Sequence, residues 1–340
     1  MADKAAARSH PQPTPKRDIV VIGASAGGVA VLLDLAADLP EDFPAAVLVV
    51  LHVGAHRSVL PELMASRGAK RALHAIDGQP LHHGTILVAP SDQHMLVQGG
   101  TIRLQRGPKE NHARPAIDPL FRSAALAHGP RVIGVVLSGR LDDGTAGLQA
   151  IKRCGGLAVI QDPADAEQPE MPVSALAHVD IDHCVPAANL VETLMRLVGT
   201  PVAAAPPAPA APSVFASEQA ISDGEDNPMD HLYQIGQPSR FACPECSGVL
   251  WEINDTQPRR YRCHTGHAYT LRTLAFAQDE SADEALWAAM RALQEREALL
   301  RALAESGDSD ADGRQGQDLS AQAEQTGKHS DQLRRMIASG

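Results

Sequence analysis

Short apolar runs alternate with amphipathic segments along the first part of the chain. The runs predicted as strands cover residues 18–22, 45–51, 85–89, 95–98, 101–104, 131–137 and 157–161. Helices are predicted over residues 30–39, 58–66, 119–127, 144–154 and 190–198. Nearly continuous Val, Ile and Leu runs that alternate with helices are typical of a parallel sheet covered on both faces. We therefore predict a three-layer α/β domain with a parallel sheet over residues 18–198.

The pattern changes beyond this domain. Residues 201–212 read PVAAAPPAPAAP, a composition typical of an extended, semi-rigid linker. A polar and acidic stretch follows, so we predict a Pro/Ala-rich and acidic linker over residues 199–239. A compact block rich in Cys and His occupies residues 240–270. Apolar residues then recur at helical spacing, which predicts a helical tail over residues 279–338.

Composition and charge exclude several classes of protein. The net charge is −11, with 30 Lys+Arg against 41 Asp+Glu, which argues against generic nucleic-acid binding because that binding needs a basic surface. No apolar run approaches the ~18 residues of a membrane-spanning helix, so no membrane insertion is expected. Residues 1–17 lack the apolar core of a secretory signal and are predicted to be a disordered N-terminal tail. Five cysteines are too few for a disulfide scaffold, so we expect a cytoplasmic protein.

A glycine-rich turn joins the first predicted strand to a helix. It reads Gly23-Ala-Ser25-Ala-Gly27-Gly28, and three interpretations are open: a phosphate-binding turn, a structural turn with an incidental Ser, or a nucleophile. The dinucleotide spacing G-x-G-x-x-G and the G-x-x-x-x-G-K-[ST] pattern are both absent. The segment does match G-x-S-x-G, in which a tight turn exposes the Ser hydroxyl above a sheet. Ser25 is therefore a candidate nucleophile.

A serine nucleophile needs a base and a group that orients the base. Because sites in open parallel sheets form at the carboxyl ends of the strands, His52, directly after the second long apolar run, is the best base. The weaker candidates are His56, His82, His83 and His94. After the run that ends at Leu137, Asp142 and Asp143 both occupy the next turn. The pattern alone does not choose between them, and capping the following helix is the alternative role for either.

Five blocks of residues 18–198 resemble the CheB-type methylesterase domain of bacterial chemotaxis. They are IGASAGG, VVLHVG, VAPSDQHMLV, GPKENHARPAIDPLFRSAA and VIGVVLSGRLDDGTAGLQAIKRCGG. The resemblance implies a catalytic triad of Ser25, His52 and Asp143, and so selects Asp143 over Asp142, which we expect to shape the turn or face solvent. It also implies that backbone N–H groups near Ala26 and Arg140 bind the oxyanion.

The activity that the resemblance implies is hydrolysis of γ-glutamyl methyl esters to glutamate and methanol, without a catalytic cofactor. The substrates would be methylated cytoplasmic helices of chemoreceptor-type proteins, and some family members also deamidate glutamine. We expect Asn111 and His112 to border the cleft and contact substrate, with an ordinary surface loop as the alternative. Family members often carry an N-terminal receiver domain; none fits ahead of Asp18, so we expect no phosphoaspartate control within this chain.

The Cys/His block has the spacing of a structural zinc ribbon. Cys243 and Cys246 form a C-x₂-C knuckle, and sixteen residues separate Cys246 from Cys263, a separation typical of zinc ribbons. We predict a structural Zn²⁺ held by these thiolates and His267, with His264 as second choice. A metal-free loop and a redox-active C-x-x-C are the alternatives.

Two further interpretations of the whole chain stay open. One is a non-enzymatic signalling adaptor that binds other signalling proteins through the Cys/His block and the tail. The other is a hydrolase of small esters or amides. Because the Pro/Ala-rich linker separates the Cys/His block from Ser25, we also expect zinc removal to leave hydrolysis of a small ester nearly unchanged.

Overall fold

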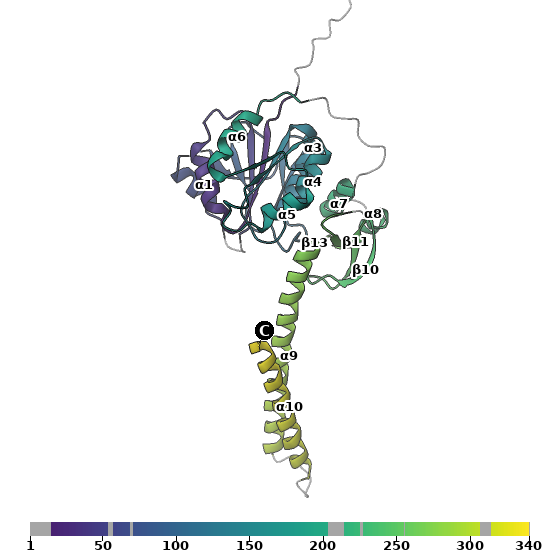
Figure 1. Cartoon of the computed structure of the whole chain (residues 1–340). Helices are drawn as coiled ribbons and strands as arrows, with labels where there is room; N and C mark the ends of the chain where they lie inside the picture. Colours follow the sequence, from purple (N-terminus) through teal and green to yellow (C-terminus); the bar gives the residue numbers. More distant parts are fainter. Residues whose placement is uncertain are drawn as a thin grey trace, which may run out of the picture. The chain divides into compact units, whose positions relative to one another are not determined.

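The computed structural model describes residues 15–53, 57–68, 71–202, 214–224, 227–254, 256–306 and 314–339. The chain forms two compact units, residues 1–273 and 274–340, which are drawn in Figure 1. No helix of the described residues has a stretch both long enough and apolar enough to cross a bilayer.

A seven-stranded parallel sheet forms the centre of the first unit. Its order is β3-β4-β2-β1-β7-β8-β9. The strands are β1 (Ile19–Ala24), β2 (Ala46–Leu51), β3 (Ala72–His74), β4 (Ile86–Val88), β7 (Val132–Val136), β8 (Leu157–Gln161) and β9 (His183–Val185). A separate antiparallel hairpin consists of β5 (His94–Gln98) and β6 (Thr101–Gln105). The predicted α/β class with a parallel sheet is confirmed.

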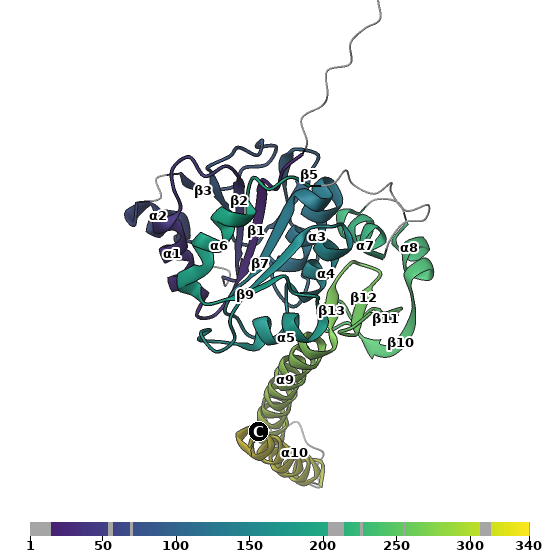
Figure 2. The same cartoon turned by 45° about the horizontal axis from the view of Figure 1, so that its top comes forward.

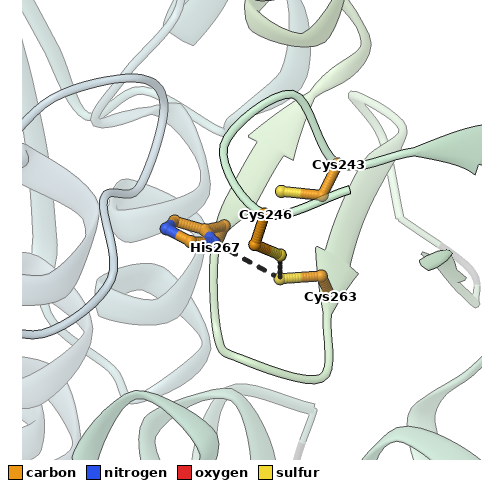
Figure 3. Close-up of side chains that lie close together, drawn as sticks. All are labelled: Cys243, Cys246, Cys263 and His267. Carbon is orange, nitrogen blue, oxygen red and sulfur yellow. Dashed lines mark hydrogen bonds between the residues drawn. The ribbon is translucent and has the colours of Figure 1, made fainter. Parts of the chain in front are cut away.

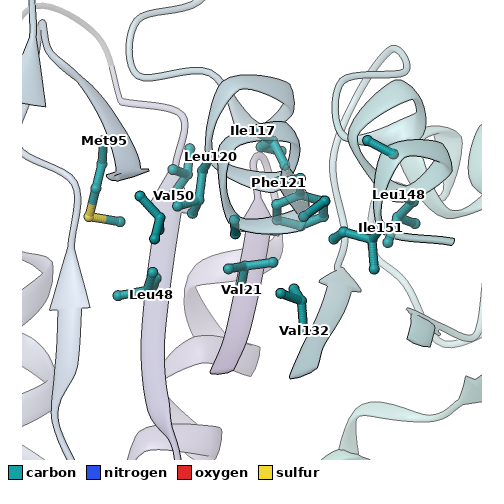
Figure 4. Close-up of a cluster of buried hydrophobic side chains, with 14 of the residues drawn as sticks. Val21, Leu48, Val50, Met95, Ile117, Leu120, Phe121, Val132, Leu148 and Ile151 are labelled. Carbon is teal, nitrogen blue, oxygen red and sulfur yellow. The ribbon is translucent and has the colours of Figure 1, made fainter. Parts of the chain in front are cut away.

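Helices cover both faces of this sheet, as Figure 2 shows. They are α1 (Gly28–Asp38), α2 (Leu60–Ser66), α3 (Ile117–His128), α4 (Thr145–Arg153), α5 (Glu170–His178) and α6 (Leu190–Leu197), with short 3-10 turns at Gly129–Arg131 and Ala187–Asn189. Side chains alternate along each strand, so Val21 packs under α3 in one core (Figure 4). Its neighbours Val20 and Ile22 pack with α1 and α6 in the other core.

The sequence pattern did not predict β3, β9 or α5. Both strands have three residues, lie at the edges of the sheet and are only partly buried. Such short edge strands lack the continuous apolar run that marks a central strand. Helix α5 contains Pro172 near its start, which hid its helical pattern.

The segment predicted as a linker over 199–239 is partly helical, and the prediction is wrong there. Helices α7 (Val214–Asp223) and α8 (Pro228–Ile235) lie within it. Phe215 of α7 is buried in the core of the α/β domain, and Leu232 of α8 packs with Trp251. These two apolar contacts give the short helices the burial that an extended linker lacks. The Pro/Ala-rich residues 203–213 lie outside the described residues.

The prediction of a disordered tail over residues 1–17 is wrong for its last residues. Residues 1–14 lie outside the described residues, but Arg17 donates its backbone N–H to the Thr200 carbonyl at 3.1 Å. Lys16 forms a β-bridge with Pro201. The residues next to β1 are therefore paired with the segment after α6.

The Cys/His block forms a four-stranded antiparallel sheet in the first unit. Its strands are β10 (Gly236–Ala242), β11 (Val249–Ile253), β12 (Arg260–Cys263) and β13 (Ala268–Thr270). We call residues 236–273 the Cys/His module. The helices of the tail are α9 (Leu271–Glu305), which starts ahead of the predicted position, and α10 (Arg314–Ser339). In the second unit, Gly327 of α10 faces the carboxylate of Glu297 on α9.

Candidate active site

Three side chains meet at the carboxyl ends of three neighbouring strands. Ser25 follows β1, His52 follows β2, and Asp143 lies in the loop after β7. His52 Nδ1 lies 3.2 Å from Ser25 Oγ, and His52 Nε2 lies 2.8 Å from Asp143 Oδ2. The structure thus brings together the three residues that the resemblance implies, in hydrogen-bonded series.

Backbone hydrogen bonds hold these strand ends in register. The His52 N–H donates to the Ala24 carbonyl at 3.1 Å, and the Ser25 N–H donates to the Ser138 carbonyl at 3.0 Å. The ladder of the parallel sheet therefore continues to the residues that carry the nucleophile and the base. The distance between Ser25 and His52 is therefore set by the strand pairing of the sheet rather than by the packing of loops.

Asp143 is buried and surrounded by donors. Its side chain is 2% exposed, and Oδ2 also accepts the Ile117 N–H at 2.7 Å. Burial raises the pKa of this carboxyl, but the hydrogen bond and charge of His52 and the donated N–H groups outweigh it, so the pKa lies below its usual value. An ionised Asp143 accepts the Nε2 proton of His52 and leaves Nδ1 as the acceptor for the Ser25 hydroxyl.

The second oxygen of Asp143 faces its own set of donors. Oδ1 accepts from Asn111 Nδ2 at 2.8 Å, from the Gly144 N–H at 2.9 Å and from the Asp118 N–H at 3.2 Å. Burial and the Asp143 charge raise the pKa of the Asp118 carboxyl well above its usual value. The donors on both oxygens favour the ionised form of Asp143.

Asp142 points away from the triad and is not solvent-exposed, contrary to one of its two expected roles. It is 1% exposed, and its Oδ1 accepts the Thr270 hydroxyl at 2.7 Å. Burial raises the pKa of this carboxyl to about 6. Asp142 therefore joins the turn after β7 to the Cys/His module.

Two glycines make room for the nucleophile. Gly27, at the start of α1, has φ +76°, and a Cβ there would lie 2.6 Å from Ser138 Oγ. Gly139 lies directly against Ser25, because a Cβ on it would lie 2.8 Å from the Ser25 Cβ and would collide with Met171 Sδ. A larger residue at either position would displace the turn that carries Ser25.

The backbone N–H groups of Ala26 and Arg140 have no acceptor among the described residues. The Ser25 carbonyl accepts the Gly28 N–H at 3.0 Å, and the Gly139 carbonyl accepts the Met171 N–H at 3.0 Å. Both peptide planes are therefore fixed. Because N–H and C=O point in opposite directions in a trans peptide, the N–H groups of Ala26 and Arg140 face away from these partners. They are available to bind an oxyanion.

A cavity of about 440 Å³ opens beside His52. Its lining includes Asn111, His112 and Leu141, so the two predicted substrate contacts border the cleft. The Asn111 amide is occupied by protein partners, however, with Nδ2 bonded to Asp118 and Asp143. His112 Nδ1 lies 3.7 Å from a Glu245 carboxylate oxygen of the Cys/His module. Their contact with substrate stays a prediction.

Three of the weaker histidine candidates, His82, His83 and His94, make no hydrogen bond with Ser25 in the described part of the chain. His94 is fully buried, where its Nε2 donates to the Pro108 carbonyl at 2.9 Å and its Nδ1 accepts the Ala116 N–H at 3.2 Å. His83 pairs with Asp18 at 3.3 Å. His82 is exposed. His56 lies outside the described residues.

Three thiols and one imidazole form a second cluster in the Cys/His module. Figure 3 shows Cys243, Cys246, Cys263 and His267 turned toward one another. Their Sγ and ring nitrogen atoms all lie within 4.8 Å of one another, and Cys243 and Cys263 are buried. A tetrahedral zinc site with Zn–S bonds of ~2.3 Å separates its sulfurs by roughly 3.8 Å, so this donor set fits such an ion. His264, the second choice, is exposed and outside the cluster.

The module is not separate from the α/β domain, contrary to expectation. Residues 1–273 form one compact unit. The Asn111 N–H donates to the Ala268 carbonyl at 2.8 Å, and the Lys109 ammonium lies 2.7 Å from Glu245. A linker in the sequence does not require separation in space, and the pattern held no signal for these contacts.

A family model described as CheB methylesterase matches residues 20–194, which is half of the 340-residue chain. The chain belongs to the CheB methylesterase family. The matched region of this CheB-family chain contains Ser25, His52 and Asp143, but ends before the Cys/His module.

Curated relatives and a solved structure agree with this family. A "Protein-glutamate methylesterase/protein-glutamine glutaminase 2" of Methanosarcina acetivorans is 35% identical over 192 residues, which cover 54% of this chain and 54% of that protein. A Leptospira interrogans protein named for the same two activities is 33% identical over 186 residues, which cover 53% of this chain and 94% of that one. The chain thus spans about half the length of the Methanosarcina relative.

The structural comparison covers the same region. The Thermotoga maritima CheB methylesterase catalytic domain is 32% identical to this CheB-family chain, with a TM-score of 0.51. The match covers 53% of this chain and 98% of that domain.

Several residues around the CheB-type site were not predicted from the sequence. Ser138 donates its hydroxyl to the Ala26 carbonyl at 2.9 Å, and Thr270 and Thr273 contact Asn111. Thr is a preferred N-cap residue, and placing the N-cap at Thr270 would have started the tail helix at Leu271. Their contact with Asn111 joins segments that are far apart along the chain, and one sequence carries no signal for such a contact.

Proposed function

We propose that this chain is a protein-glutamate methylesterase that uses Ser25, His52 and Asp143 as its catalytic triad. The substrate class is γ-glutamyl methyl ester on cytoplasmic helices of chemoreceptor-type proteins. The products are glutamate and methanol. Glutamine side chains on the same helices are a second substrate, with ammonia as the leaving group in place of methanol.

In the first step, Ser25 Oγ attacks the ester carbonyl while His52 Nδ1 takes the hydroxyl proton. The carbonyl oxygen becomes an oxyanion, which the N–H groups of Ala26 and Arg140 bind. Removal of one such donor typically slows a reaction by about 10²–10³-fold. As the C–O bond to methoxide breaks, His52 returns the proton to it, so that methanol leaves and a glutamyl ester remains on Ser25.

In the second step, water attacks this ester. His52 Nδ1 takes a proton from the water, and the oxyanion forms again in the same place. The bond to Ser25 Oγ then breaks, His52 protonates Ser25, and glutamate is released. Asp143 keeps the Nε2 proton throughout and stabilises the imidazolium that forms in each step. Only protein groups and water take part.

The observation that supports this mechanism best is the pair of distances around His52. One ring nitrogen lies 3.2 Å from the Ser25 hydroxyl and the other lies 2.8 Å from Asp143. A general base must be within hydrogen-bond reach of the proton that it removes, and His52 meets this condition. The family and the relatives' names support a protein-glutamate methyl ester or a protein glutamine as the substrate, and the sequence resemblance implies that the substrate lies on chemoreceptor-type helices.

We also propose that Cys243, Cys246, Cys263 and His267 hold one structural Zn²⁺. Support comes from their close grouping at the β10–β11 and β12–β13 turns and from the preference of zinc for thiolate and imidazole ligands. Elemental analysis of the purified chain tests this. We expect one zinc per chain, lost in Cys243→Ser and kept in His264→Ala, and a metal-free protein with an intact fold would contradict the proposal.

The catalytic proposal is tested with a methyl-labelled chemoreceptor-type protein. We expect the full chain to release labelled methanol, Ser25→Ala to release none above background, and the exposed serine variant Ser66→Ala to match the parent. Methanol release from small methyl esters alone would favour the small-ester hydrolase. Binding of the receptor without release of methanol or ammonia would favour the signalling adaptor. Either result would overturn the proposal.

A further inference from the structure

The first observation concerns a loop of the α/β domain that pairs with β13. The Asn111 N–H donates to the Ala268 carbonyl at 2.8 Å, and the Ala268 N–H donates to the Lys109 carbonyl at 3.3 Å. Glu110 forms a parallel β-bridge with Ala268. The loop therefore extends the sheet of the Cys/His module, and the same loop carries Asn111 into the active site.

Four polar groups lie within hydrogen-bond distance of the Asn111 side-chain amide. On the side of the α/β domain, Nδ2 donates to Asp118 Oδ2 at 2.8 Å and to Asp143 Oδ1 at 2.8 Å. On the side of the module, Oδ1 lies 3.2 Å from the Thr270 N–H and 3.3 Å from the Thr273 hydroxyl. The Thr270 N–H is shared with Thr273 Oγ, and the Thr273 hydroxyl is shared with the Thr270 carbonyl. Asn111 is thus the link between the module and the proposed catalytic carboxylate.

Thr270 and Thr273 are themselves fixed by each other. Thr270 Oγ accepts the Thr273 N–H at 3.1 Å, and Thr273 Oγ accepts the Thr270 N–H at 2.8 Å. This reciprocal arrangement is a capping box at the start of α9. Both threonines are 1% exposed. The groups that hold Asn111 therefore have defined positions as long as β13 is in place.

The position of β13 depends in turn on the Cys/His cluster. Cys263 ends β12 and His267 directly precedes β13, and the Cys263 N–H donates to the His267 carbonyl at 3.0 Å. A metal ion bound by Cys263 and His267 would close the turn between β12 and β13. Residues 264–267 of this turn bury no apolar side chain, although Tyr269 of β13 is buried. Metal binding in such small modules supplies folding free energy.

A buried ion-pair network fixes the module on the α/β domain next to this link. Glu110 binds Arg122 of α3 at 2.9 Å and Arg262 of β12 at 3.0 Å. Arg260 of β12 binds Glu218 of α7 at 2.6 Å. All five side chains are buried. Separation of the module would leave buried charges without partners, which is strongly unfavourable, so the docked arrangement is the stable one.

We propose that the Cys/His module is a metal-dependent positioning element for the catalytic carboxylate. Zinc at the cluster orders β13, and Thr270 and Thr273 then hold Asn111, which holds Asp143 against His52. The three are positioning residues, since each acts through Asp143. This inference rests on the Ser-His-Asp chemistry proposed above, but not on the identity of the substrate. It replaces the expectation that zinc removal leaves small-ester hydrolysis unchanged.

The test measures the rate at which a fluorophosphonate modifies Ser25. In this reaction Ser25 Oγ bonds to phosphorus, fluoride leaves, and His52 takes the proton, so the rate reports the triad without any ester substrate. We expect removal of zinc from the full chain to slow modification by about 10²-fold, the order expected when a reacting group is misplaced by ~1 Å. Added Zn²⁺ should restore the rate. The low-field proton NMR signal of the His52–Asp143 hydrogen bond should disappear and return in parallel.

Variants at full zinc content separate positioning from folding. Thr273→Val should slow modification by about 10-fold or more, and Thr273→Ser, which keeps the hydroxyl, should restore it. Thr256 lies in the same module, where its hydroxyl donates to the Ile253 carbonyl, so Thr256→Val is the matched control and should react like the parent. If the metal-free chain unfolds as a whole, Thr273→Val decides the question, because its zinc content and circular dichroism report its fold.

Equal modification rates in the parent, the metal-free chain and Thr273→Val would overturn this inference. Another outcome would distinguish a failure of the proposed function from a failure of this inference. If fluorophosphonate labelling depends on zinc and on Thr273 but no methyl ester or glutamine is hydrolysed, the positioning role stands and the substrate assignment fails.

Discussion

The side-chain amide of Asn111 donates to Asp143 across 2.8 Å, and its oxygen accepts from two threonines of the Cys/His module. The carboxylate that orients His52 is therefore held by groups from two parts of the sequence that lie far apart along the chain. The three residues of the proposed triad belong to the α/β domain, but the residues that surround them come from both this domain and the Cys/His module. This relationship makes the module part of the active-site structure rather than an appendage.

Substitution within the triad should abolish turnover. Ser25→Ala, His52→Ala and Asp143→Asn should each lower kcat by about 10⁴-fold, because proton transfer passes through all three groups. Double variants should lose little more than single ones, since the residues act as a unit. Steady-state methanol release checks this, and an active Asp143→Asn would show that a different acid orients His52.

The Asp142 carboxyl should lower the free energy of unfolding at neutral pH, and its effect should depend on pH. Its pKa is about 6 in the folded chain against an ordinary 3.8, so the folded state binds more protons between these values and loses stability as the pH rises through them. The loss amounts to about 3 kcal/mol at most. Asp142→Asn keeps an acceptor for Thr270 without the charge, so it should raise the unfolding free energy at pH 7. Urea unfolding should show no gain in the unfolding free energy of Asp142→Asn over the parent below pH ~4. A gain below pH ~4 as large as the gain at pH 7 would contradict this prediction.

Gly139→Ala should damage catalysis through contact with Ser25. The added Cβ would lie 2.8 Å from the Ser25 Cβ and would collide with Met171, which displaces the nucleophile by a few tenths of an ångström or more. A loss of up to about 10²-fold in kcat is expected, which is the effect of a shift of ~1 Å. Gly100→Ala is the matched control, since a Cβ there meets no atom of the described residues within 4 Å. Equal activity of the two variants would refute the close approach of Gly139.

Arg262→Met should destabilise the α/β domain and the module together. Burial raises the pKa of Glu110, but the charges of Arg122 and Arg262 hold it far below its usual value. The substitution removes one of these two charges from a buried carboxylate. Loss of one partner of a buried pair typically costs about 3–5 kcal/mol. Arg259→Met, which removes a side chain that is 60% exposed, should have little effect.

Urea unfolding monitored by Trp251 fluorescence, in a Trp287→Phe background, reports the module. Loss of fluorophosphonate labelling reports the triad. The two transitions should coincide in the parent chain and shift together in Arg262→Met. Two separate transitions in the parent would mean that the module folds apart from the α/β domain.

The fold of the α/β domain is predictable because its central strands are apolar on both sides. Val21 and Ile22 occupy different cores of the same sheet, so no polar alternation interrupts the run and the strand is unmistakable. Short elements such as β9 have no such run and depend on neighbours that are distant in the sequence. The place of Ser25 and His52 follows from the parallel topology, since both directly follow adjacent central strands.

The choice of acid and the role of the module are less accessible from the sequence. Asp142 and Asp143 are neighbours in the same turn, and only their directions in the fold distinguish them: one faces Thr270 and the other faces His52. The contacts of Asn111 with Thr270 and Thr273 depend on docking across the Pro/Ala-rich segment. Composition identifies such a segment as a linker, but it carries no information about what the joined parts contact.

The covalent intermediate on Ser25 offers the most direct test of the central claim. The full chain is mixed with a γ-methyl-glutamyl peptide of a chemoreceptor-type helix, quenched with acid at short times, and digested for mass spectrometry. We predict a transient glutamyl ester on the peptide that contains Ser25, formed together with methanol and absent from Ser25→Ala. Methanol release that proceeds without this adduct and is undiminished in Ser25→Ala would contradict the account.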